Sequence, residues 1–416
     1  MWKKISEIDH PLILHVTPHL GGGLGAVLRA WVLEDAACRH MIATLDYAND
    51  WSKKELGAAG IPLYDQPSAA ELDRLVQAAD IVLVHFWNHP LLYDWLARPH
   101  PAARLAIWTH IAGLTPPNLI TPEIAGLPDE LVLTTPISRA CPALRGRDVP
   151  FIWSTSGIQR MLDLQPLAHE GLAAGYVGTV DFAKMHPDYI RVHEKLPADR
   201  FLIVGGEDVA HVRCGADERF VFPGRVDDVR PYLAQMDIFA YLLNPRHFGT
   251  CEQALQEAMA AGVPPVVLGN PCEASIVRDG ETGLVARDLE EYVRDARRLL
   301  EEEDLRRRLA ACARAYAAHH FSMEEMVQLW HAVFCRMMAR EKRLHRWPAV
   351  PEDAFALFCM SIGKEAAGIF CSGSKKEIQE LLQKPEWQSA SKGTPKQWCT
   401  FLGGARLEAL CELYGR

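Results

Sequence analysis

The sequence has no long apolar run. None of its apolar stretches approaches the roughly 20 residues that a helix needs to cross a bilayer. The first ten residues, MWKKISEIDH, lack the apolar core of a secretory signal. These absences argue against a membrane-spanning protein and against a secreted one. We therefore expect a cytoplasmic chain whose contact with a membrane is at most peripheral.

The chain also has no excess of positive charge. It carries 44 Lys and Arg against 53 Asp and Glu, a net charge of -9 at pH 7, whereas nucleic-acid-binding proteins typically show a basic excess. Its eleven cysteines include no Cys-x-x-Cys pair, and no Cys/His cluster has the spacing of a zinc site. We expect reduced thiols, no nucleic-acid partner and no bound metal.

Apolar residues are abundant, at 49% of the chain, and they form short runs that alternate with helical segments. Such runs occur at residues 11–16, 40–45, 81–85, 105–108 and 131–134, and the series restarts at 174–178, 201–204, 220–222, 238–241 and 266–268. Strands alternating with helices predict parallel sheets with helices on both faces. We predict an α/β fold with two Rossmann-like lobes facing a cleft, and ligands bound beyond the carboxyl ends of the strands.

The chain of 416 residues is too long for one ordinary domain. We expect an N-terminal lobe over residues 1–165 and a C-terminal lobe over 166–343, the latter ending in a strongly helical stretch from 289. Trp347 and Pro348 then interrupt the helical pattern. Residues 344–416 are expected to form a small, mostly helical accessory region, to which the sequence assigns no role. The oligomeric state is not predicted.

A glycine-rich segment follows the first predicted strand. Residues 21–26, GGGLGA, have the form G-x-G-x-x-A before a predicted helix at 26–33, and Asp46 lies about 20 residues further on. This pattern is typical of a dinucleotide site, in which the acid binds a ribose hydroxyl. Taken alone, it predicts an NAD(P)-dependent Rossmann oxidoreductase, which is one of two competing functions for the chain.

Residues 246–267 form a second distinctive segment, RHFGTCEQALQEAMAAGVPPVV. Thr250 and Gln253 have the spacing of a capping box, which predicts that Thr250 caps a helix. Gly262 suits the end of that helix, and the following Pro-Pro pair prevents its continuation. A helix that starts directly after Gly249 is suited to bind a phosphate group.

The whole segment resembles glycosyltransferase family 4, whose members have the GT-B fold, use nucleotide sugars and retain the anomeric configuration. The resemblance extends through the second predicted lobe. Gly178 and Lys184 match a strand-loop that faces the diphosphate, with Thr179 where the family has an arginine. Residues 222–226, FPGRV, match the part that borders the nucleobase, and residues 279–284, DGETGL, match a later loop.

The resemblance implies roles for individual residues of this lobe. Lys184 and the amides at the helix start would stabilise the diphosphate, and Glu257 would bind the ribose hydroxyls. The family's other acid, which contacts the donor sugar, lies eight residues before this glutamate; that position is Gly249, so Glu252 is the expected substitute. The implied donor-binding residues here are Gly178, Arg225, Val226, Gly249, Thr250, Cys251 and Glu252.

The resemblance also assigns residues of the first lobe. Gly23 and Gly25 would belong to a turn that borders the donor phosphates. His110, which follows the strand at 105–108, is placed where the family often has a histidine facing the donor sugar, and it joins Lys184 and Glu257 as an expected catalytic residue. His85 ends another strand, and Trp87 and Trp108 either stack on a sugar or pack in the core.

Together these matches predict a retaining, hexosyltransferase-like enzyme. It would move a sugar from a UDP- or GDP-linked donor to an acceptor, in the assembly of a polysaccharide, glycolipid or other glycoconjugate. The nucleotide sugar is a co-substrate and no further cofactor is expected; no Asp-x-Asp on a loop is available to hold Mg²⁺. Three alternatives remain: the oxidoreductase, a protein that binds a nucleotide sugar without transferring it, and a scaffold whose C-terminal tail docks a partner. Donor base, sugar and acceptor are left open.

Overall fold

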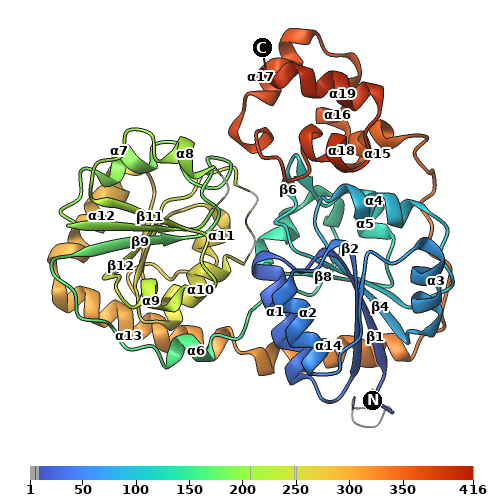
Figure 1. Cartoon of the computed structure of the whole chain (residues 1–416), viewed down its shortest axis with the longest axis horizontal. Helices are drawn as coiled ribbons and strands as arrows, with labels where there is room; N and C mark the ends of the chain where they lie inside the picture. Colours follow the sequence, from blue (N-terminus) through green and yellow to red (C-terminus); the bar gives the residue numbers. More distant parts are fainter. Residues whose placement is uncertain (1–4, 6–8, 207, 248, 250, 416) are drawn as a thin grey trace. The chain divides into compact units, whose positions relative to one another are not determined.

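The computed structural model describes residues 5, 9–206, 208–247, 249 and 251–415. The chain forms two compact units, one made of Met1–Ser156 with Met323–Arg416 and the other of Gly157–Ser322. Each unit contains one parallel sheet with helices packed around it (Figure 1). The predicted α/β class with two Rossmann-like lobes and a helical C-terminal region is therefore confirmed.

The first unit is built on six parallel strands in the order β3-β2-β1-β4-β5-β8. The strands are β1 (Leu12–His19), β2 (Arg39–Tyr47), β3 (Leu63–Asp65), β4 (Ile81–Phe86), β5 (Leu105–Thr109) and β8 (Glu130–Leu133). The connecting helices are α1 (Gly22–Glu34), α2 (Asp50–Ala58), α3 (Ala69–Ala78), α4 (Pro90–Ala97) and α5 (Pro122–Gly126). A short antiparallel pair, β6 (Leu114–Thr115) with β7 (Asn118–Leu119), follows β5. The strand order reverses between β1 and β4, and ligands of such sheets bind at the carboxyl ends of the strands there.

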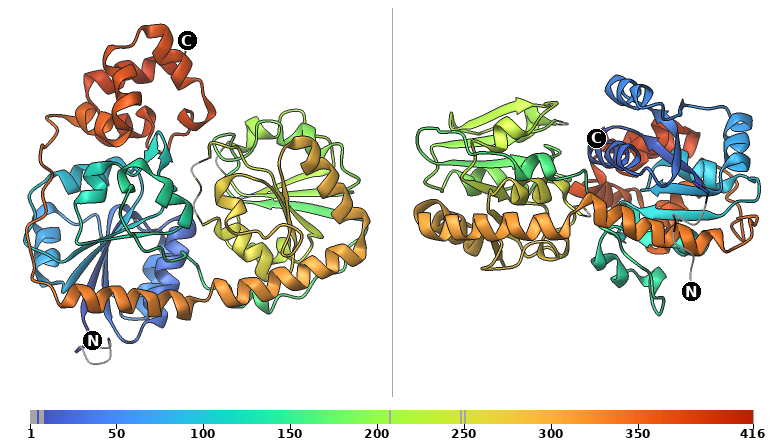
Figure 2. Two further views of the ribbon diagram at one scale, coloured as in Figure 1. Left: turned by 180° about the vertical axis from the view of Figure 1, so that it is seen from behind. Right: turned by 90° about the horizontal axis from the view of Figure 1, so that it is seen from below.

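Both faces of this sheet are buried, because successive side chains of a strand point to opposite sides. Leu14 and Val16 of β1 belong to one apolar cluster, while Ile13 belongs to another. The second cluster contains Trp31 of α1 and Trp330, whose ring centroids lie 5.3 Å apart. Trp330 lies on α14 (Met323–Met338), so this helix is part of the first unit (Figure 2).

The division of the chain differs from the predicted boundaries at 165 and 343. Residues 323–343 were expected in the second lobe because the helical pattern from 289 continues across them. The apolar face of α14 instead packs against the first sheet, with Trp330 and Phe334 buried beside Trp31. Helical periodicity shows that a helix has an apolar face, but it does not show which sheet that face covers.

The second unit contains six parallel strands in the order β11-β10-β9-β12-β13-β14. The strands are β9 (Ala173–Val177), β10 (Arg200–Val204), β11 (Phe220–Gly224), β12 (Ile238–Tyr241), β13 (Pro265–Leu268) and β14 (Leu284–Ala286). The helices are α6 (Gln159–Leu162), α7 (Tyr189–His193), α8 (Val209–Val212), α9 (Arg230–Leu233), α10 (Gln253–Ala260), α11 (Pro271–Ala274), α12 (Leu289–Glu301) and α13 (Glu303–His320). This order repeats that of the first unit, so β9 and β12 flank the point of reversal.

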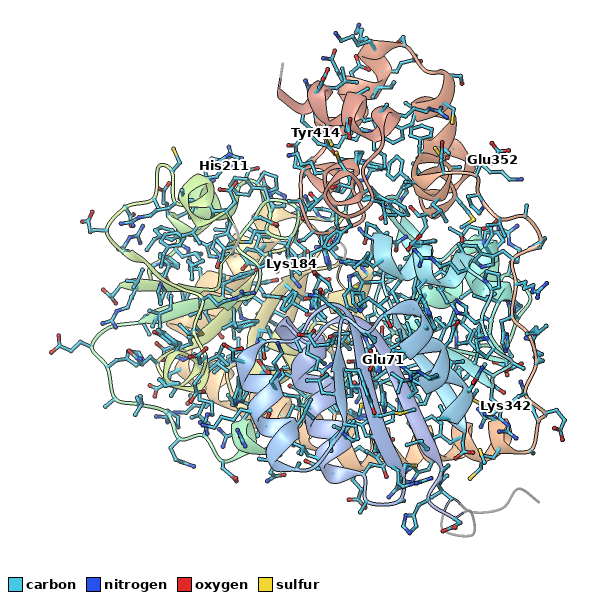
Figure 3. The ribbon with its side chains drawn as sticks, turned by 45° about the vertical axis from the view of Figure 1, so that its right-hand side comes forward. Glu71, Lys184, His211, Lys342, Glu352 and Tyr414 are labelled. Atoms are coloured by element: carbon cyan, nitrogen blue, oxygen red, sulfur yellow. The ribbon has the colours of Figure 1, made fainter. Side chains whose placement is uncertain are left out.

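The C-terminal helices share a core with the first unit. They are α15 (Ala354–Ser361), α16 (Gly363–Ser372), α17 (Lys375–Leu382), α18 (Pro395–Phe401) and α19 (Ala405–Cys411). The buried ring of Trp398 lies 5.8 Å from that of Tyr93 on α4. Near the C-terminus, Tyr414 (Figure 3) donates a hydrogen bond of 2.8 Å to the carbonyl oxygen of Trp387. The accessory region is therefore packed on the first unit, against helix α4.

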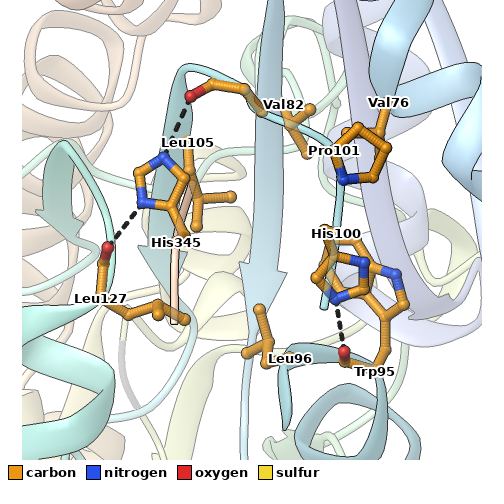
Figure 4. Close-up of a pocket in the computed structure, with 10 residues that line it drawn as sticks. Val76, Val82, Trp95, Leu96, His100, Pro101, Leu105, Leu127 and His345 are labelled. Carbon is orange, nitrogen blue, oxygen red and sulfur yellow. Dashed lines mark hydrogen bonds between the residues drawn. The ribbon is translucent and has the colours of Figure 1, made fainter. Parts of the chain in front are cut away.

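The segment that leads from α14 to these helices is fastened to the amino edge of the first sheet. Lys342 donates from Nζ to the carbonyl oxygens of Gln77 and Ala79, at 3.0 and 2.7 Å (Figure 3). His345 places Nδ1 2.8 Å from the carbonyl oxygen of Leu127 and Nε2 3.0 Å from that of Ala103 (Figure 4). Because both acceptors are carbonyl oxygens, both ring nitrogens must donate, which requires a protonated imidazole.

A small apolar pocket lies beside His345 (Figure 4). Its walls include Val82 and Leu105, which stand near or at the starts of β4 and β5. The pocket is therefore at the amino edge of the sheet, opposite the edge at which such folds bind ligands. Across the part of the chain that is described, no helix has both the length and the apolar composition that crossing a membrane requires.

Candidate functional site

The residues predicted in the second unit lie after its strands. Gly178 directly follows β9, and Arg225 and Val226 directly follow β11. Lys184 lies further along the segment after β9 (Figure 3), and Glu252 immediately precedes α10. Since all six strands are parallel, these positions share the carboxyl edge of the sheet, where ligands of such sheets bind.

Lys184 and Glu252 form a buried ion pair. The Lys184 ammonium lies 2.7 Å from Oε2 of Glu252, and the two side chains are 13% and 1% exposed. The Tyr241 hydroxyl at the end of β12 donates to the same oxygen at 2.5 Å. Burial alone would raise the pKa of Glu252, but the Lys184 ammonium outweighs it and, with the Tyr241 hydroxyl, holds this pKa below its usual range. Glu252 is therefore a carboxylate that a cation and a hydroxyl hold in place.

The backbone of Glu252 has a conformation that is rare for a residue with a side chain. Its φ and ψ are 37° and 69°, in the left-handed region. Such a conformation costs a non-glycine residue about 1–2 kcal/mol. The surrounding contacts must offset this strain, and residues held in this way are concentrated at functional sites.

Gly249 provides the space for the Glu252 carboxylate. A Cβ at position 249 would lie 1.7 Å from Oε1 of Glu252 and 2.4 Å from the ring of His247. Any side chain at position 249 would therefore displace the acid. Within the described residues, Oε1 of Glu252 is buried without a hydrogen-bond partner, so it can still accept a hydrogen bond.

His247 connects this carboxylate to a second one. Its Nε2 lies 2.9 Å from Oε2 of Glu273, and its Nδ1 lies 3.8 Å from Oε1 of Glu252. Burial alone would lower the pKa of His247, whereas the two glutamates raise it. The Gly249 amide nevertheless donates to Nδ1 at 2.8 Å, so Nδ1 presents a lone pair and Nε2 donates to Glu273. Asn270 donates to the other oxygen of Glu273 at 2.8 Å.

The predicted helix start at Thr250 is wrong. Helix α10 begins at Gln253 and its N-cap position is Glu252, with no side-chain cap. The left-handed backbone of Glu252 interrupts the helical path before Gln253. Thr250 itself lies outside the described residues. Cys251 is buried, and Gln256 donates to its carbonyl oxygen at 2.7 Å.

The other predicted residues of this unit are half-buried or exposed. Glu257 stands in the second turn of α10 and is half-buried; its predicted contact with a ribose is a matter for experiment. Arg225 is exposed and Val226 is half-buried. A Cβ added at Gly178 would lie 2.8 Å from the Tyr176 hydroxyl. That hydroxyl donates a hydrogen bond of 2.7 Å to the carbonyl oxygen of Thr179.

The first unit's glycine segment belongs to a helix rather than to a loop. Helix α1 begins at Gly22, with Gly21 as its N-cap, so Gly23 and Gly25 lie in its first turns. The predicted start at residue 26 was too late, because glycine has a low helix propensity and the prediction relied on apolar spacing. A Cβ on Gly25 would lie 2.3 Å from the carbonyl oxygen of Leu20, so this glycine allows β1 and α1 to pack closely.

His110 follows β5 at the carboxyl edge of the first sheet, as the sequence predicted. Its Nε2 lies 3.1 Å from Nδ1 of His85, and burial lowers the pKa of both imidazoles. Trp108 is fully buried against Trp31 and Trp330, so this tryptophan packs in the core. Trp87 is half-buried beside His19, with ring centroids 5.1 Å apart.

The buried polar residues around the Lys184–Glu252 ion pair form a cluster in the second unit. The sequence analysis did not predict four of its members, which are Tyr241, His247, Asn270 and Glu273. A signal existed for three of them. Tyr241 ends a predicted strand, and Asn270 and Glu273 come shortly after another, which places all three near the carboxyl edge. Among described residues, two triplets bring metal-ligand atoms within 4.8 Å of one another: Asp35, Cys38 and His331, and His247, Cys272 and Glu273. Either could hold a metal.

A family model described as glycosyl transferases group 1 matches residues 173–302, which contain this cluster. Over 131 residues the chain is 29% identical to N-acetyl-alpha-D-glucosaminyl L-malate synthase of Bacillus anthracis, covering 30% of this chain and 33% of that protein. Over 118 residues it is 30% identical to the lipopolysaccharide core biosynthesis glycosyltransferase LpsE of Rhizobium meliloti, covering 28% and 34%. The chain thus matches about a third of the length of these curated relatives.

Solved structures resemble a larger part of the chain. The crystal structure of Anabaena HepE in complex with UDP and glucose has a TM-score of 0.62 at 15% identity, covering 79% of this chain and all of HepE. A glycosyltransferase from Rickettsia africae has a TM-score of 0.63 at 13% identity, with coverage of 80% and 100%. The chain therefore has the GT-B fold, and residues 173–302 of its second unit are similar to the glycosyl transferases group 1 model.

Proposed function

We propose that the chain is a glycosyltransferase that moves a sugar from a nucleoside diphosphate sugar to an acceptor, with its donor bound at the carboxyl edge of the second sheet. The observation that carries this proposal is the buried Lys184–Glu252 pair within the matched domain. The similarity to the glycosyltransferase LpsE and to a glucosaminyl L-malate synthase supports it over the oxidoreductase and over a protein that only binds a nucleotide sugar.

The two charges suit the two ends of such a donor. An ammonium group at this edge can stabilise the negative charge that develops on a leaving diphosphate. A carboxylate accepts hydrogen bonds from sugar hydroxyls, and Oε1 of Glu252 has no hydrogen-bond partner among the described residues. An unpaired buried acceptor costs about 1–3 kcal/mol, so a hydroxyl that reaches it gains binding energy.

Glu252 takes the place of an acid at position 249 in this proposal. Its carboxylate fills the space into which a side chain at 249 would extend, since Oε1 lies 1.7 Å from a Cβ built on Gly249. Gly249 and Glu252 therefore act together. The absence of a side chain at 249 leaves space for a carboxylate, and Glu252 supplies that carboxylate. Glu257 on α10 would bind the ribose.

The finer assignments are part of the proposal. The reaction retains the anomeric configuration, needs no metal or other cofactor, and occurs in the cytoplasm. A uridine donor is favoured because HepE, of similar fold, was crystallised with UDP and with UDP-glucose. The relative LpsE acts in lipopolysaccharide core biosynthesis, which favours glycoconjugate assembly as the setting.

The test is release of nucleoside diphosphate from UDP- and GDP-linked sugars by the full chain, with hydrolysis as the background reaction. We expect release by the wild type and a loss of about 10²–10³-fold in Lys184→Ala, the range for removing one transition-state donor. Lys195→Ala is the matched control because Lys195 is exposed in the same unit. NADH oxidation without nucleotide release would overturn the proposal.

Lys184→Ala leaves the Glu252 carboxylate buried without its cation, which can cost about 3–5 kcal/mol of stability. A second variant, Lys184→Met with Glu252→Gln, removes both charges and keeps similar volumes. It should fold and also lack turnover. Full turnover in this double variant would remove the ion pair from the reaction.

A further inference from the structure

A cluster of metal-ligand atoms lies in the first unit, where α1 ends and β2 begins. Oδ1 of Asp35, the residue that follows α1, lies 2.8 Å from Nε2 of His331 on α14. The thiol of Cys38 completes a triplet whose ligand atoms all lie within 4.8 Å of one another. Asp35 and Cys38 are buried, and the side chain of His331 is 18% exposed. A carboxylate oxygen, a thiolate sulfur and an imidazole nitrogen are ligands that Zn²⁺ binds in proteins.

His40 adds a nitrogen without a hydrogen-bond partner beside this triplet. Its Nε2 lies 3.3 Å from Oδ2 of Asp35 but makes no hydrogen bond among the described residues, and its side chain is 2% exposed. Burying a polar atom without a partner costs free energy, and coordination of a metal ion would remove that cost. The other ring nitrogen of His40 lies 2.9 Å from Nε2 of His15, which is the second contact that a metal-binding histidine usually makes. Structural zinc sites have four ligands, and His40 is the candidate for the fourth.

The surroundings of the cluster suit a metal site in two ways. Trp31 donates from Nε1 to Oδ2 of Asp35 at 3.3 Å, and the amide of Ala37 donates to Oδ1 at 3.1 Å. Outer contacts of this kind orient the ligands of a metal. Since the His331 side chain is partly exposed, it connects the cluster to solvent, from which an ion can enter.

The position of the cluster separates it from substrate binding. Cys38 directly precedes β2 and His40 is the second residue of that strand, so both lie at the amino edge of the first sheet. Ligands of such sheets bind at the opposite edge. Asp35 and His331 are 296 positions apart in the sequence, which is why the spacing of cysteines and histidines did not predict this site.

The triplet in the second unit differs, because its members already pair with one another or with the backbone. Nε2 of His247 lies 2.9 Å from Oε2 of Glu273, and the Cys272 thiol donates to the carbonyl oxygen of Gly249 at 3.0 Å. The unpartnered nitrogen of His40 therefore favours the first unit as the place for an ion.

We propose that the cluster binds one Zn²⁺ ion, which fastens α14 to the start of β2. Its four ligands are Asp35, Cys38, His40 and His331. On binding, the Cys38 thiol releases its proton to solvent and coordinates as a thiolate. The ion is structural, and the site does not depend on the proposed sugar transfer, for which we propose no metal.

Titration with Co²⁺ tests the site on the full chain after a chelator has removed any bound metal. A thiolate ligand gives Co²⁺ a charge-transfer band in the near ultraviolet, and Zn²⁺ displaces Co²⁺ because it binds such sites more tightly. We expect one equivalent of Co²⁺ to produce the band in the wild type and Zn²⁺ to remove it. Cys38→Ser should lose the band. Cys141→Ser should keep it, since Cys141 is another buried thiol of the same unit.

Three results would overturn the proposal: no band in the wild type, a band that survives in Cys38→Ser, or a band that Cys272→Ser removes. The last would place the ion in the second unit.

A second variant keeps the test decisive if Cys38→Ser does not fold. His331 is the most exposed of the four ligands, so His331→Ala changes the interior least. Losing an outer contact of a metal site already costs about 10–100-fold in affinity, so we expect Co²⁺ to bind at least about tenfold more weakly. Zn²⁺ should also raise the Tm of the wild type more than that of this variant. His319→Ala is the control, because His319 is exposed on α13. Equal Co²⁺ affinity in the two variants would contradict the assignment of His331.

Discussion

At the scale of single residues, Gly249 and Glu252 fit together, because the Glu252 carboxylate fills the space into which a side chain at 249 would extend. The carboxylate reaches the same place from a residue whose backbone is left-handed, and glycine at 249 is the condition for that route. The sequence predicted Glu252 as the substitute for an acid at 249 without a geometric reason, and its contact with a donor sugar stays a prediction. The reason depends on the left-handed backbone of Glu252. A helix that starts at Thr250, as the capping-box pattern predicted, would instead give Glu252 a helical backbone.

Gly249→Ala should therefore impair the site although it adds only one methyl group. The new Cβ would lie 1.7 Å from Oε1 of Glu252, so the carboxylate must move away from Lys184. We expect at least about a tenfold loss of nucleotide release and about 1–3 kcal/mol of lost stability, as for other overpacked interiors. Gly269→Ala is the control, because its nearest neighbour would lie 3.4 Å away. Equal turnover in the two variants would contradict this account of Gly249.

At the scale of elements, the sequence predicted strands where an apolar run is long enough to stand out. The runs at 81–85 and 105–108 correspond to β4 and β5. It missed β3, whose three residues are only half-buried, and β14, which is equally short. It also assigned α14 to the wrong unit. Strand length and periodicity are local properties, whereas the partner of an apolar face is set by the tertiary structure.

The segment between α14 and α15 should make the stability of the first unit depend on pH. Burial alone would lower the pKa of His345, but Asp129 and the carbonyls of Leu127 and Ala103 raise it. Its contribution to stability is thus complete below the unfolded pKa and is lost as pH rises through the folded one. Burial alone would raise the pKa of Asp129, but His345 and Arg343 lower it from 3.8 to about 2. That contribution is lost as pH falls through this range.

The stability difference between the wild type and His345→Gln should therefore be largest near pH 5 and should shrink toward pH 9. Urea midpoints measured across this range would show it. His211→Gln is the control, because His211 is exposed on α8 of the other unit (Figure 3). A difference that stays constant with pH would mean that His345 is neutral and holds the segment by packing alone.

At the scale of the whole molecule, the C-terminal helices are part of the first unit rather than an independent appendage. Trp398 is fully buried, and its ring lies 5.8 Å from that of Tyr93 on α4 and 5.9 Å from that of Phe358 on α15. The sequence predicted a helical region here but described it as separate. The local sequence can predict that a region is helical, but it cannot show that this region shares a core with another part of the chain.

Trp398→Ala should consequently destabilise the first unit by about 3–5 kcal/mol, the usual cost of removing a buried tryptophan side chain. Trp51→Ala is the comparison, since Trp51 is 54% exposed, and it should cost less than about 1 kcal/mol. Chemical unfolding followed by a spectroscopic probe of the first unit would measure both. Similar losses in the two variants would mean that the C-terminal helices contribute little to that unit's stability.

In the proposed function, the carboxyl edge of the second sheet binds a nucleoside diphosphate through Lys184 and Glu257. Calorimetric titration of the full chain with UDP and GDP tests it most directly. We predict that the wild type binds one of them, and that Glu257→Ala and the Lys184→Met, Glu252→Gln double variant each bind it at least about tenfold more weakly, a loss of about 1.4 kcal/mol. Lys195→Ala should bind as the wild type does. Unchanged affinity in both site variants, or binding of NADH in place of either nucleotide, would contradict the account.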